Sequence, residues 1–223
     1  MSDLPLLDLG GHRLVLASAS ARRAELLGSV GLRFEVIPAD IDETVRPAEV
    51  PAAYVARLSR RKAEVVAARL TGDTIVVAAD TTVDVDGRIL EKPADDDDAR
   101  RMLRLLSGRT HLVHTGVTVA GLHRDGDEAS ASVADVGPGV ETVVVETAVS
   151  FVELDDRALE WYLATGEAAG KAGAYGIQGA AGAFVERVDG SVTNVIGLPL
   201  AQTLALLTPF ARHLTRNRAE SGR

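Results

Sequence analysis

Residues 74–90 read TIVVAADTTVDVDGRIL, and this stretch decides the fold. Residues 74–79 form a near-continuous apolar run, which is typical of a central strand covered on both faces. The Asp-Gly pair at 86–87 lies between two segments of alternating, β-rich sequence, which is a strong signal for a hairpin. Asp80 and Thr81 directly follow the apolar run. The pattern therefore predicts a buried strand that ends at a polar pair, at the mouth of an open α/β sheet where ligands bind.

Strand and helix patterns mix along the rest of the chain. Short apolar or alternating runs predict strands, and apolar residues at helical spacing predict helices. The further strands are expected at residues 14–17, 34–37, 111–122, 142–152 and 184–188. The further helices are expected at residues 21–30, 51–70, 95–106, 155–164 and 198–210. This mixture favours an α/β fold.

The chain has 223 residues, enough for one large domain or two small lobes. We expect a single two-lobed domain over residues 14–210, after an N-terminal extension at 1–13 and before a polar tail at 211–223 that frays. Residues 123–140 are rich in Gly, Ser, Asp and Ala, which indicates a surface excursion whose role stays open. The segment 123–150 could belong to a partly separate lobe.

Composition excludes several classes of function. The formal net charge of −8 and the low aromatic content of 4% argue against a nucleic-acid or membrane-surface binder. The absence of cysteine excludes disulfides, thiolate nucleophiles, iron–sulfur clusters and cysteine zinc sites. The N-terminus has no basic region before an apolar run, and no run of roughly 20 apolar residues exists. We therefore expect a soluble cytoplasmic protein.

A first candidate site lies where the strand at 14–17 gives way to a helix. Ser18 and Ser20 supply hydroxyls there, and Arg22 and Arg23 supply guanidinium groups. A helix N-terminus presents unpaired N–H groups, and Arg binds phosphate oxygens in a bidentate way, so the cluster could hold an anion. The alternative is a capping serine with two solvated arginines.

Carboxylates and lysines form a second set of candidates. Asp80 could bind Mg²⁺ or accept a proton from water, although a simple turn aspartate is the alternative. Glu43 could supply a second metal-ligand carboxylate, and Lys62 and Lys92 are candidate cations. Pro93 holds Lys92 in extended backbone, which fixes where this lysine points. Solvated surface groups are the alternative for all three.

A glycine-dense segment at 170–182 could bring backbone close to a ligand. It carries Lys171, Tyr175 and Gln178, and a glutamine amide can read the edge of a base. A flexible loop is the alternative. The five histidines show no metal-ligand spacing, and we expect none of them to bind metal.

Taken together, these motifs resemble the Maf family of nucleoside triphosphate pyrophosphatases. The matching text is LVLASASARRAELL, DIDET, AADTTVDVDGRILEKP, RRMLRLLSGRTHLVHTGV and GKAGAYGIQGAAGAFVERVDGSVTNVIGLPL, which spans about residues 14–200. The resemblance implies a Maf/ITPase-like α/β fold, with an elongated mixed sheet flanked by helices and a central nucleotide cleft between two lobes. It also implies hydrolysis of a nucleoside triphosphate to the monophosphate and pyrophosphate, with a divalent metal such as Mg²⁺ or Mn²⁺.

The resemblance also implies roles for the candidate residues. Asp80 would be the general base and a metal ligand, and Glu43 the second metal carboxylate. The phosphates would be neutralised, and the growing transition-state charge stabilised, by cations. These cations are Arg22, Arg23, Lys62 and Lys92. The family resemblance further implies a homodimer.

Substrate preference follows from three positions of the same resemblance. Family members similar to dTTP/UTP pyrophosphatases carry an arginine, a threonine and a glutamine where this chain has Arg22, Thr81 and Gln178. We therefore expect a preference for dTTP, UTP and C5-modified pyrimidine nucleotides, in a role of nucleotide-pool housekeeping. The alternatives are a purine or 7-methyl-GTP preference, and a non-catalytic nucleotide-binding regulator of cell division.

The chain departs from the family pattern at two positions. Ala21 replaces the usual proline of the first motif, which we expect to loosen the helix start slightly without loss of function. Gly170 replaces the acidic residue that usually precedes the loop lysine, which puts an ion pair of Lys171 in doubt.

Overall fold

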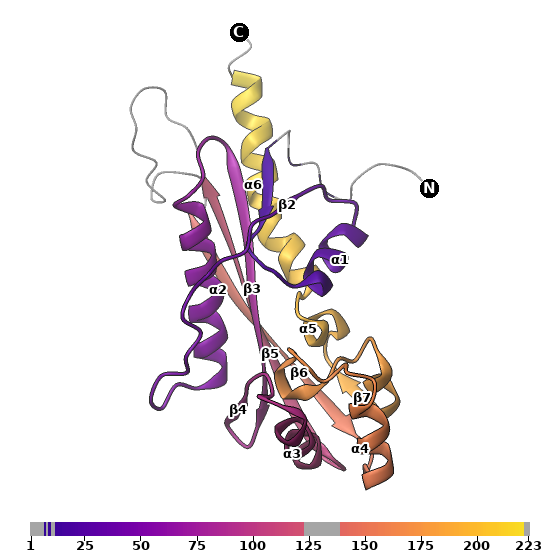
Figure 1. Ribbon diagram of the computed structural model, residues 1–223. Helices are drawn as coiled ribbons and strands as arrows, with labels where there is room; N and C mark the ends of the chain where they lie inside the picture. Colours follow the sequence, from indigo (N-terminus) through magenta and orange to yellow (C-terminus); the bar gives the residue numbers. More distant parts are fainter. Residues whose placement is uncertain (1–6, 8, 10–11, 123–138, 221–223) are drawn as a thin grey trace.

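The computed structural model describes residues 7, 9, 12–122 and 139–220, with only the backbone described at 211–220. Its strands form a mixed seven-stranded sheet in the order β2-β1-β3-β5-β6-β7, with β4 paired to β3 (Figure 1). The strands are β1 (Arg13–Leu16), β2 (Glu35–Val36), β3 (Thr74–Val85), β4 (Arg88–Leu90), β5 (Thr110–Leu122), β6 (Val140–Phe151) and β7 (Val185–Asp189). The helices are α1 (Ala21–Ser29), α2 (Pro51–Ala67), α3 (Asp96–Leu106), α4 (Asp156–Leu163), α5 (Val192–Ile196) and α6 (Leu200–Glu220). The predicted α/β class is confirmed.

The three long strands β3, β5 and β6 form the spine of an elongated molecule (Figure 1). At one end of β3, Ile75 and Val77 pack into a core with α1 and α6, while Val76 faces a second core under α2. At the other end, Val83 and Val85 belong to a separate core with α3 and α4. Successive strand residues point to opposite faces, which explains the two cores at the first end. The separate core at the other end gives two lobes on one continuous sheet.

Strand β3 is longer than the sequence predicts. It does not end at Ala79 but continues through Asp80 to Val85, and it pairs with β5 from Thr74 to Asp84. The apolar run stops at Ala79 because the core of the first lobe stops there, not because the strand stops. The parallel neighbour β1 ends opposite Val77, and β4 pairs with β3 only from Val83 onward. Among the described strands, residues 78–82 of β3 therefore have no partner on this edge, and this stretch carries polar residues between the lobes.

Several other predicted segments have different bounds in the structure. Helix α6 does not end near residue 210 but continues to Glu220, through Pro209. Residues 140–151 are strand β6 of the main sheet and do not form part of a separate lobe. The predicted excursion at 123–140 lies almost wholly outside the described residues. Strand β1 begins at Arg13 within the expected extension, where Leu9 is also buried. In the described part of the chain, no helix is long and apolar enough to cross a membrane.

Gly116 of β5 lets α2 lie close to the sheet. A Cβ at Gly116 would lie 2.4 Å from the backbone oxygen of Val55, and backbone cannot yield as a side chain can. Gly116 also pairs with Asp80, so this close approach sets the height of α2 over the site. We expect Gly116→Ala to lower the free energy of unfolding by about 2–3 kcal/mol, as overpacking does.

Urea unfolding of Gly116→Ala beside Gly28→Ala measures this effect. At Gly28, within α1, an added Cβ would have its nearest neighbour at 3.9 Å. Gly28→Ala should therefore be neutral or stabilising by up to about 1 kcal/mol. A Gly116→Ala protein as stable as the wild type would show that α2 does not depend on this contact.

Candidate active site

A cavity of about 610 Å³ lies between the two lobes. Its walls come from the β1–α1 connection, the middle of β3, one face of α2 and the segment 170–178. The structure brings all the predicted site residues together in its lining. These are Ser18, Ser20, Arg22, Arg23, Glu43, Lys62, Asp80, Thr81, Lys92 and Gln178.

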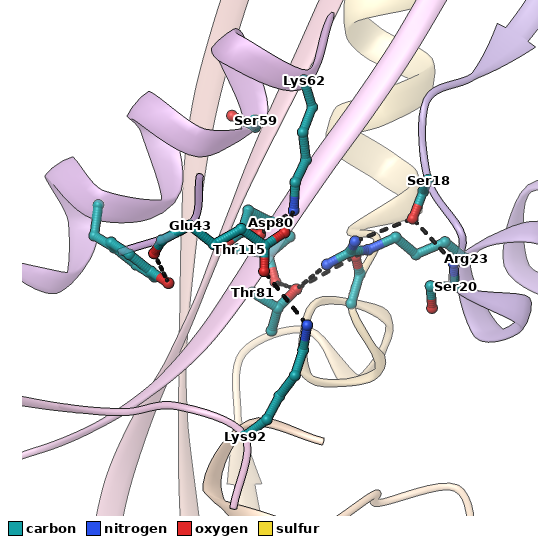
Figure 2. A network of polar contacts seen from close by, with 12 residues as sticks. Ser18, Ser20, Arg23, Glu43, Ser59, Lys62, Asp80, Thr81, Lys92 and Thr115 are labelled. Carbon is teal, nitrogen blue, oxygen red and sulfur yellow. Dashed lines mark hydrogen bonds and ion pairs between the residues drawn. The ribbon is translucent and has the colours of Figure 1, made fainter. Parts of the chain in front are cut away.

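The Lys62 ammonium joins two carboxylates at the centre of this cavity (Figure 2). Its Nζ lies 2.6 Å from Oδ1 of Asp80 and 2.5 Å from Oε1 of Glu43. The side chains of Lys62 and Asp80 are 8% and 9% exposed, so water screens this pair little. Lys92 approaches Glu43 from the opposite side at 3.4 Å and remains 63% exposed. The site therefore holds two carboxylates and two ammonium groups in one connected network.

Contacts from α2 hold the segment that carries Glu43. The Tyr54 hydroxyl donates to the Glu43 carbonyl at 3.0 Å, and the Arg57 guanidinium donates to the Thr44 carbonyl at 3.1 Å. Arg57 also pairs with Glu49 at 2.6 Å, which holds the pKa of that carboxyl down to about 2. These bonds fix the position of Glu43 although its segment is neither helix nor strand.

The environment separates the two carboxylates in acidity. Burial raises the pKa of Asp80, and the nearby cations Lys62 and Arg23 only partly oppose this effect. Burial also acts on Glu43, but the ammonium groups of Lys62 and Lys92 prevail and lower its pKa. Asp80 is thus the more basic of the two carboxylates, while Glu43 stays anionic.

Arg23 is held by three protein acceptors on the cavity wall. Its Nε donates to the Gly197 carbonyl at 2.8 Å, and its two terminal nitrogens donate to Ser18 Oγ at 3.2 Å and Thr81 Oγ1 at 3.1 Å. The Thr81 hydroxyl also contacts Thr115 Oγ1 at 2.9 Å (Figure 2). Arg23 therefore enters the cavity in a fixed orientation, and the Thr81 hydroxyl is already engaged with it.

The serines at the start of α1 differ from the simple capping alternative. Ser20 occupies the N-cap position, but its hydroxyl caps no helical N–H group. Ser18 Oγ instead accepts from the Ser20 N–H at 3.2 Å. The Ser20 hydroxyl and the first N–H groups of α1 therefore lie at the cavity without a capping bond, which suits an anion.

Arg22 and Gln178 complete the lining. Within the described residues, Arg22 makes no hydrogen bond or ion pair, so its guanidinium has not been neutralised by a protein partner. Gln178 is exposed and lines the cavity from the segment 170–178. The structure thus places a free cation and an amide at the site, as the sequence pattern indicated.

The carboxylates suit a divalent cation that also binds the substrate. Glu43 and Asp80 each contact the Lys62 ammonium through one oxygen, so the two carboxylates lie close together and each has a second oxygen that could face a metal. The described residues hold no group of three His, Cys, Asp or Glu arranged for a metal. Mg²⁺ is commonly held by one or two carboxylates together with substrate phosphates, and these residues fit that pattern.

Sequence reasoning missed several residues of the site. Tyr54, which lies within the helix predicted at 51–70, donates a hydrogen bond to the Glu43 carbonyl. Thr115 links Thr81 to the Asn194 carbonyl, to which it donates at 2.9 Å. Helix α5, which supplies that carbonyl, was not predicted, because its five residues are too short for a periodic signal.

Comparison with known proteins supports one family for the chain. The model of the family described as "Maf-like protein" matches residues 13–210. The chain is 53% identical to a "dTTP/UTP pyrophosphatase" of Anaeromyxobacter dehalogenans (strain 2CP-C), over 87% of this chain and 92% of the relative. It is 50% identical to a protein of the same name from Myxococcus xanthus (strain DK1622), over 87% of this chain and 90% of the relative.

Among solved structures, the chain is similar to the Staphylococcus aureus Ham1 protein. The likeness covers 65% of this chain and 72% of that one, at 17% identity and a TM-score of 0.38, which is too weak to support an argument. The match to the family model and the sequence identities near 50% establish the family of the chain by themselves. The chain belongs to the Maf-like protein family.

Proposed function

We propose that this protein hydrolyses dTTP and UTP to the nucleoside monophosphate and pyrophosphate. The observation that carries the proposal is the network in which Lys62 joins Asp80 and Glu43. The same cavity is also lined by Arg22 and Arg23. Relatives that match most of the chain bear the name of this activity. Fixed cations and a buried carboxylate are what phosphoryl transfer to water needs.

In this proposal, the cations bind the triphosphate and Asp80 acts on the water. Arg22, Arg23 and the N-terminus of α1 hold phosphate oxygens on one side, and Lys92 holds them on the other. Lys62 occupies one oxygen of Asp80, which leaves the second oxygen to accept a proton from water. The water oxygen forms a bond to the α-phosphorus, while the bond between the α-phosphorus and the oxygen bridging to the β-phosphorus breaks. Pyrophosphate leaves with the electron pair of the broken bond.

Glu43 and Asp80 would hold a divalent cation, Mg²⁺ or Mn²⁺. Such a cation supplies positive charge that neutralises phosphate oxygens in the transition state. The lowered pKa of Glu43 keeps this carboxylate anionic and therefore ready to bind a cation at neutral pH.

Hydrolysis in ¹⁸O-labelled water tests which bond breaks. Attack at the α-phosphorus places the label in UMP and leaves the pyrophosphate unlabelled. Label in pyrophosphate, or release of UDP and inorganic phosphate, would contradict the proposed reaction. Repeating the assay with chelator and with added Mg²⁺ or Mn²⁺ tests the metal, because activity should disappear in chelator and return with the cation.

Gln178 is proposed to read the pyrimidine edge. We expect Gln178→Ala to lower the ratio of kcat/KM for UTP to that for GTP by roughly 10-fold, because one base-reading amide contributes about 1–3 kcal/mol of discrimination. Its effect on kcat for UTP should be smaller, since Gln178 is not in the network of Asp80 and Lys62. Steady-state kinetics with both nucleotides measure the ratio, and an unchanged ratio would mean that the base is read elsewhere.

We further infer a cytoplasmic homodimer that removes unwanted pyrimidine nucleotides from the pool. This part is supported by the family resemblance. Light scattering on the purified protein should give twice the chain mass of 23.4 kDa, and a mass of 23.4 kDa would contradict the dimer.

A further inference from the structure

The segment that carries Gln178 also carries a second cavity-lining side chain, Lys171. It runs through two 3₁₀ turns, η1 (Ala172–Ala174) and η2 (Ala180–Phe184). The side chains of Lys171 and Gln178 meet over Gly176. A Cβ at that glycine would lie 2.9 Å from Lys171 Cε and 3.3 Å from Gln178 Nε2. A residue that fixes this segment would therefore orient both side chains at once.

Glu167 contacts this segment at both ends. Its backbone carbonyl accepts a hydrogen bond from the Lys171 ammonium. Its carboxylate accepts the Ala180 N–H, with oxygens at 3.2 and 3.1 Å from the nitrogen. Glu167 does not line the cavity. It therefore lies behind the two cavity-lining side chains and links the two ends of the segment that carries them.

The absence of a side chain at Gly179 leaves room for the Glu167 carboxylate. A Cβ at Gly179 would lie 2.0 Å from Glu167 Oε2 and 2.7 Å from Glu167 Cδ. The carboxylate thus fills the space that a side chain at 179 would need. Any larger residue at 179 must move the carboxylate away from the Ala180 N–H. Gly179 and Glu167, twelve residues earlier in the chain, therefore form one contact.

We propose that Glu167 is a positioning residue for base selection. Its carboxylate holds the Ala180 end of the segment, and with it Gln178, in the orientation that reads the nucleotide, while its backbone carbonyl holds Lys171 at the other end. The inference rests on the proposed function, because it names what sets the pyrimidine preference of that site. Glu167 touches no reacting group. Its loss should therefore change KM and the choice of base, and leave the chemical step nearly intact.

The test compares Glu167→Ala, Glu167→Gln and a control, Glu186→Ala. Loss of a charge-assisted hydrogen bond should lower the UTP-to-GTP ratio of kcat/KM by ~5–10-fold, mainly through KM for UTP, with kcat within ~3-fold. Glu167→Gln retains an oxygen acceptor for the Ala180 N–H and should keep the ratio within ~2-fold of wild type. Glu186 is exposed on β7 outside the cavity, so Glu186→Ala should behave as wild type.

A second variant separates positioning from simple loss of stability. Gly179→Ala should reproduce the altered ratio, because its Cβ displaces the carboxylate. In Glu167→Ala/Gly179→Ala the two effects should not add, since both remove the same contact. Assays are run below the melting temperature of every variant. An unchanged ratio in Glu167→Ala, or additive effects in the double variant, would overturn the proposal.

Binding of non-hydrolysable α,β-imido-UTP and α,β-imido-GTP distinguishes failure of this inference from failure of the proposed function. If the wild type binds the uridine analogue more tightly but cleaves no nucleotide, the proposed reaction is wrong. In that case, loss of the preference for the uridine analogue in Glu167→Ala would support the inference. Retention of the preference in Glu167→Ala would contradict the inference. A wild type that binds both analogues equally, or neither, overturns the inference directly.

Discussion

Asp80→Asn should lower kcat for UTP by at least ~10²-fold, as loss of a general base does. Asparagine has nearly the same shape as aspartate but cannot accept the proton from the attacking water. KM should change less, because the arginines and Lys92, which are the proposed phosphate ligands, are untouched. Steady-state kinetics with circular dichroism of the same sample give the result, since folding must be intact for the comparison.

The environment of Asp80 makes this prediction specific. Its side chain is 9% exposed, and burial raises its pKa, which makes it a better proton acceptor than an ordinary aspartate. Glu43→Gln is the matched comparison, because it also removes one carboxylate from Lys62 but leaves the base in place. If Asp80→Asn turned over UTP at close to the wild-type rate, Asp80 would not be the base.

Lys62→Met should have the largest effect on stability. Removing one partner of a buried ion pair leaves the other as an uncompensated charge, which costs about 3 kcal/mol or more. Both Lys62 and Asp80 are almost fully buried, so solvent does not relieve this cost. Chemical unfolding at pH 7.5 should show the loss, and kcat should fall too because the lysine that contacts the proposed base, Asp80, is gone.

The deficit of Lys62→Met should depend on pH in one direction. The lysine lowers the pKa of Asp80, so its removal raises that pKa further above the unfolded value. A carboxyl with a raised folded pKa stabilises the fold below its unfolded pKa of about 3.9 and loses this contribution as pH rises through the folded pKa. The deficit relative to wild type should therefore be small near pH 4 and grow toward neutral pH.

The double variant Asp80→Asn/Lys62→Met supplies the control. With no carboxylate left at position 80, most of the cost at pH 7.5 should be recovered, apart from the contact of Lys62 with the half-exposed Glu43. A deficit that is independent of pH, or one that the double variant does not relieve, would show that the loss comes from packing of the lysine stem.

Much of the fold can be predicted from local sequence patterns. The main error of that prediction is the end of β3. The hairpin at 86–87 and the helix that begins in the acidic run at 95–98 are where the sequence places them, because turn and cap chemistry is local. The end of β3 was wrong because an apolar run marks only apolar burial, and β3 continues past Ala79 with polar residues that are also buried, such as Asp80 and Thr82. Strand continuity depends on the partner β5, which is some 30 residues away.

The site shows the same division between local and distant information. Its residues could be named from motifs, and the cavity contains them all. The hydrogen-bond partners of these residues could not be predicted from motifs, because the partners are distant in the sequence. The bond of Arg23 to Gly197 spans 174 residues, and that of Lys62 to Asp80 spans 18. Thr81 illustrates the consequence. The resemblance marks it for specificity, and its hydroxyl also contacts Thr115, which the register of β3 with β5 brings beside it, and Arg23, which helix α1 brings from 58 residues away.

The measurement that tests the central claim most directly is pyrophosphate release from dTTP, UTP, CTP, GTP and 7-methyl-GTP. It uses the full chain with Mg²⁺ or Mn²⁺, beside the Asp80→Asn variant. The account predicts release chiefly from dTTP and UTP, and loss of that release in the variant. Release chiefly from GTP or 7-methyl-GTP would contradict the pyrimidine preference, and binding of nucleotides without any release would contradict the enzymatic function itself.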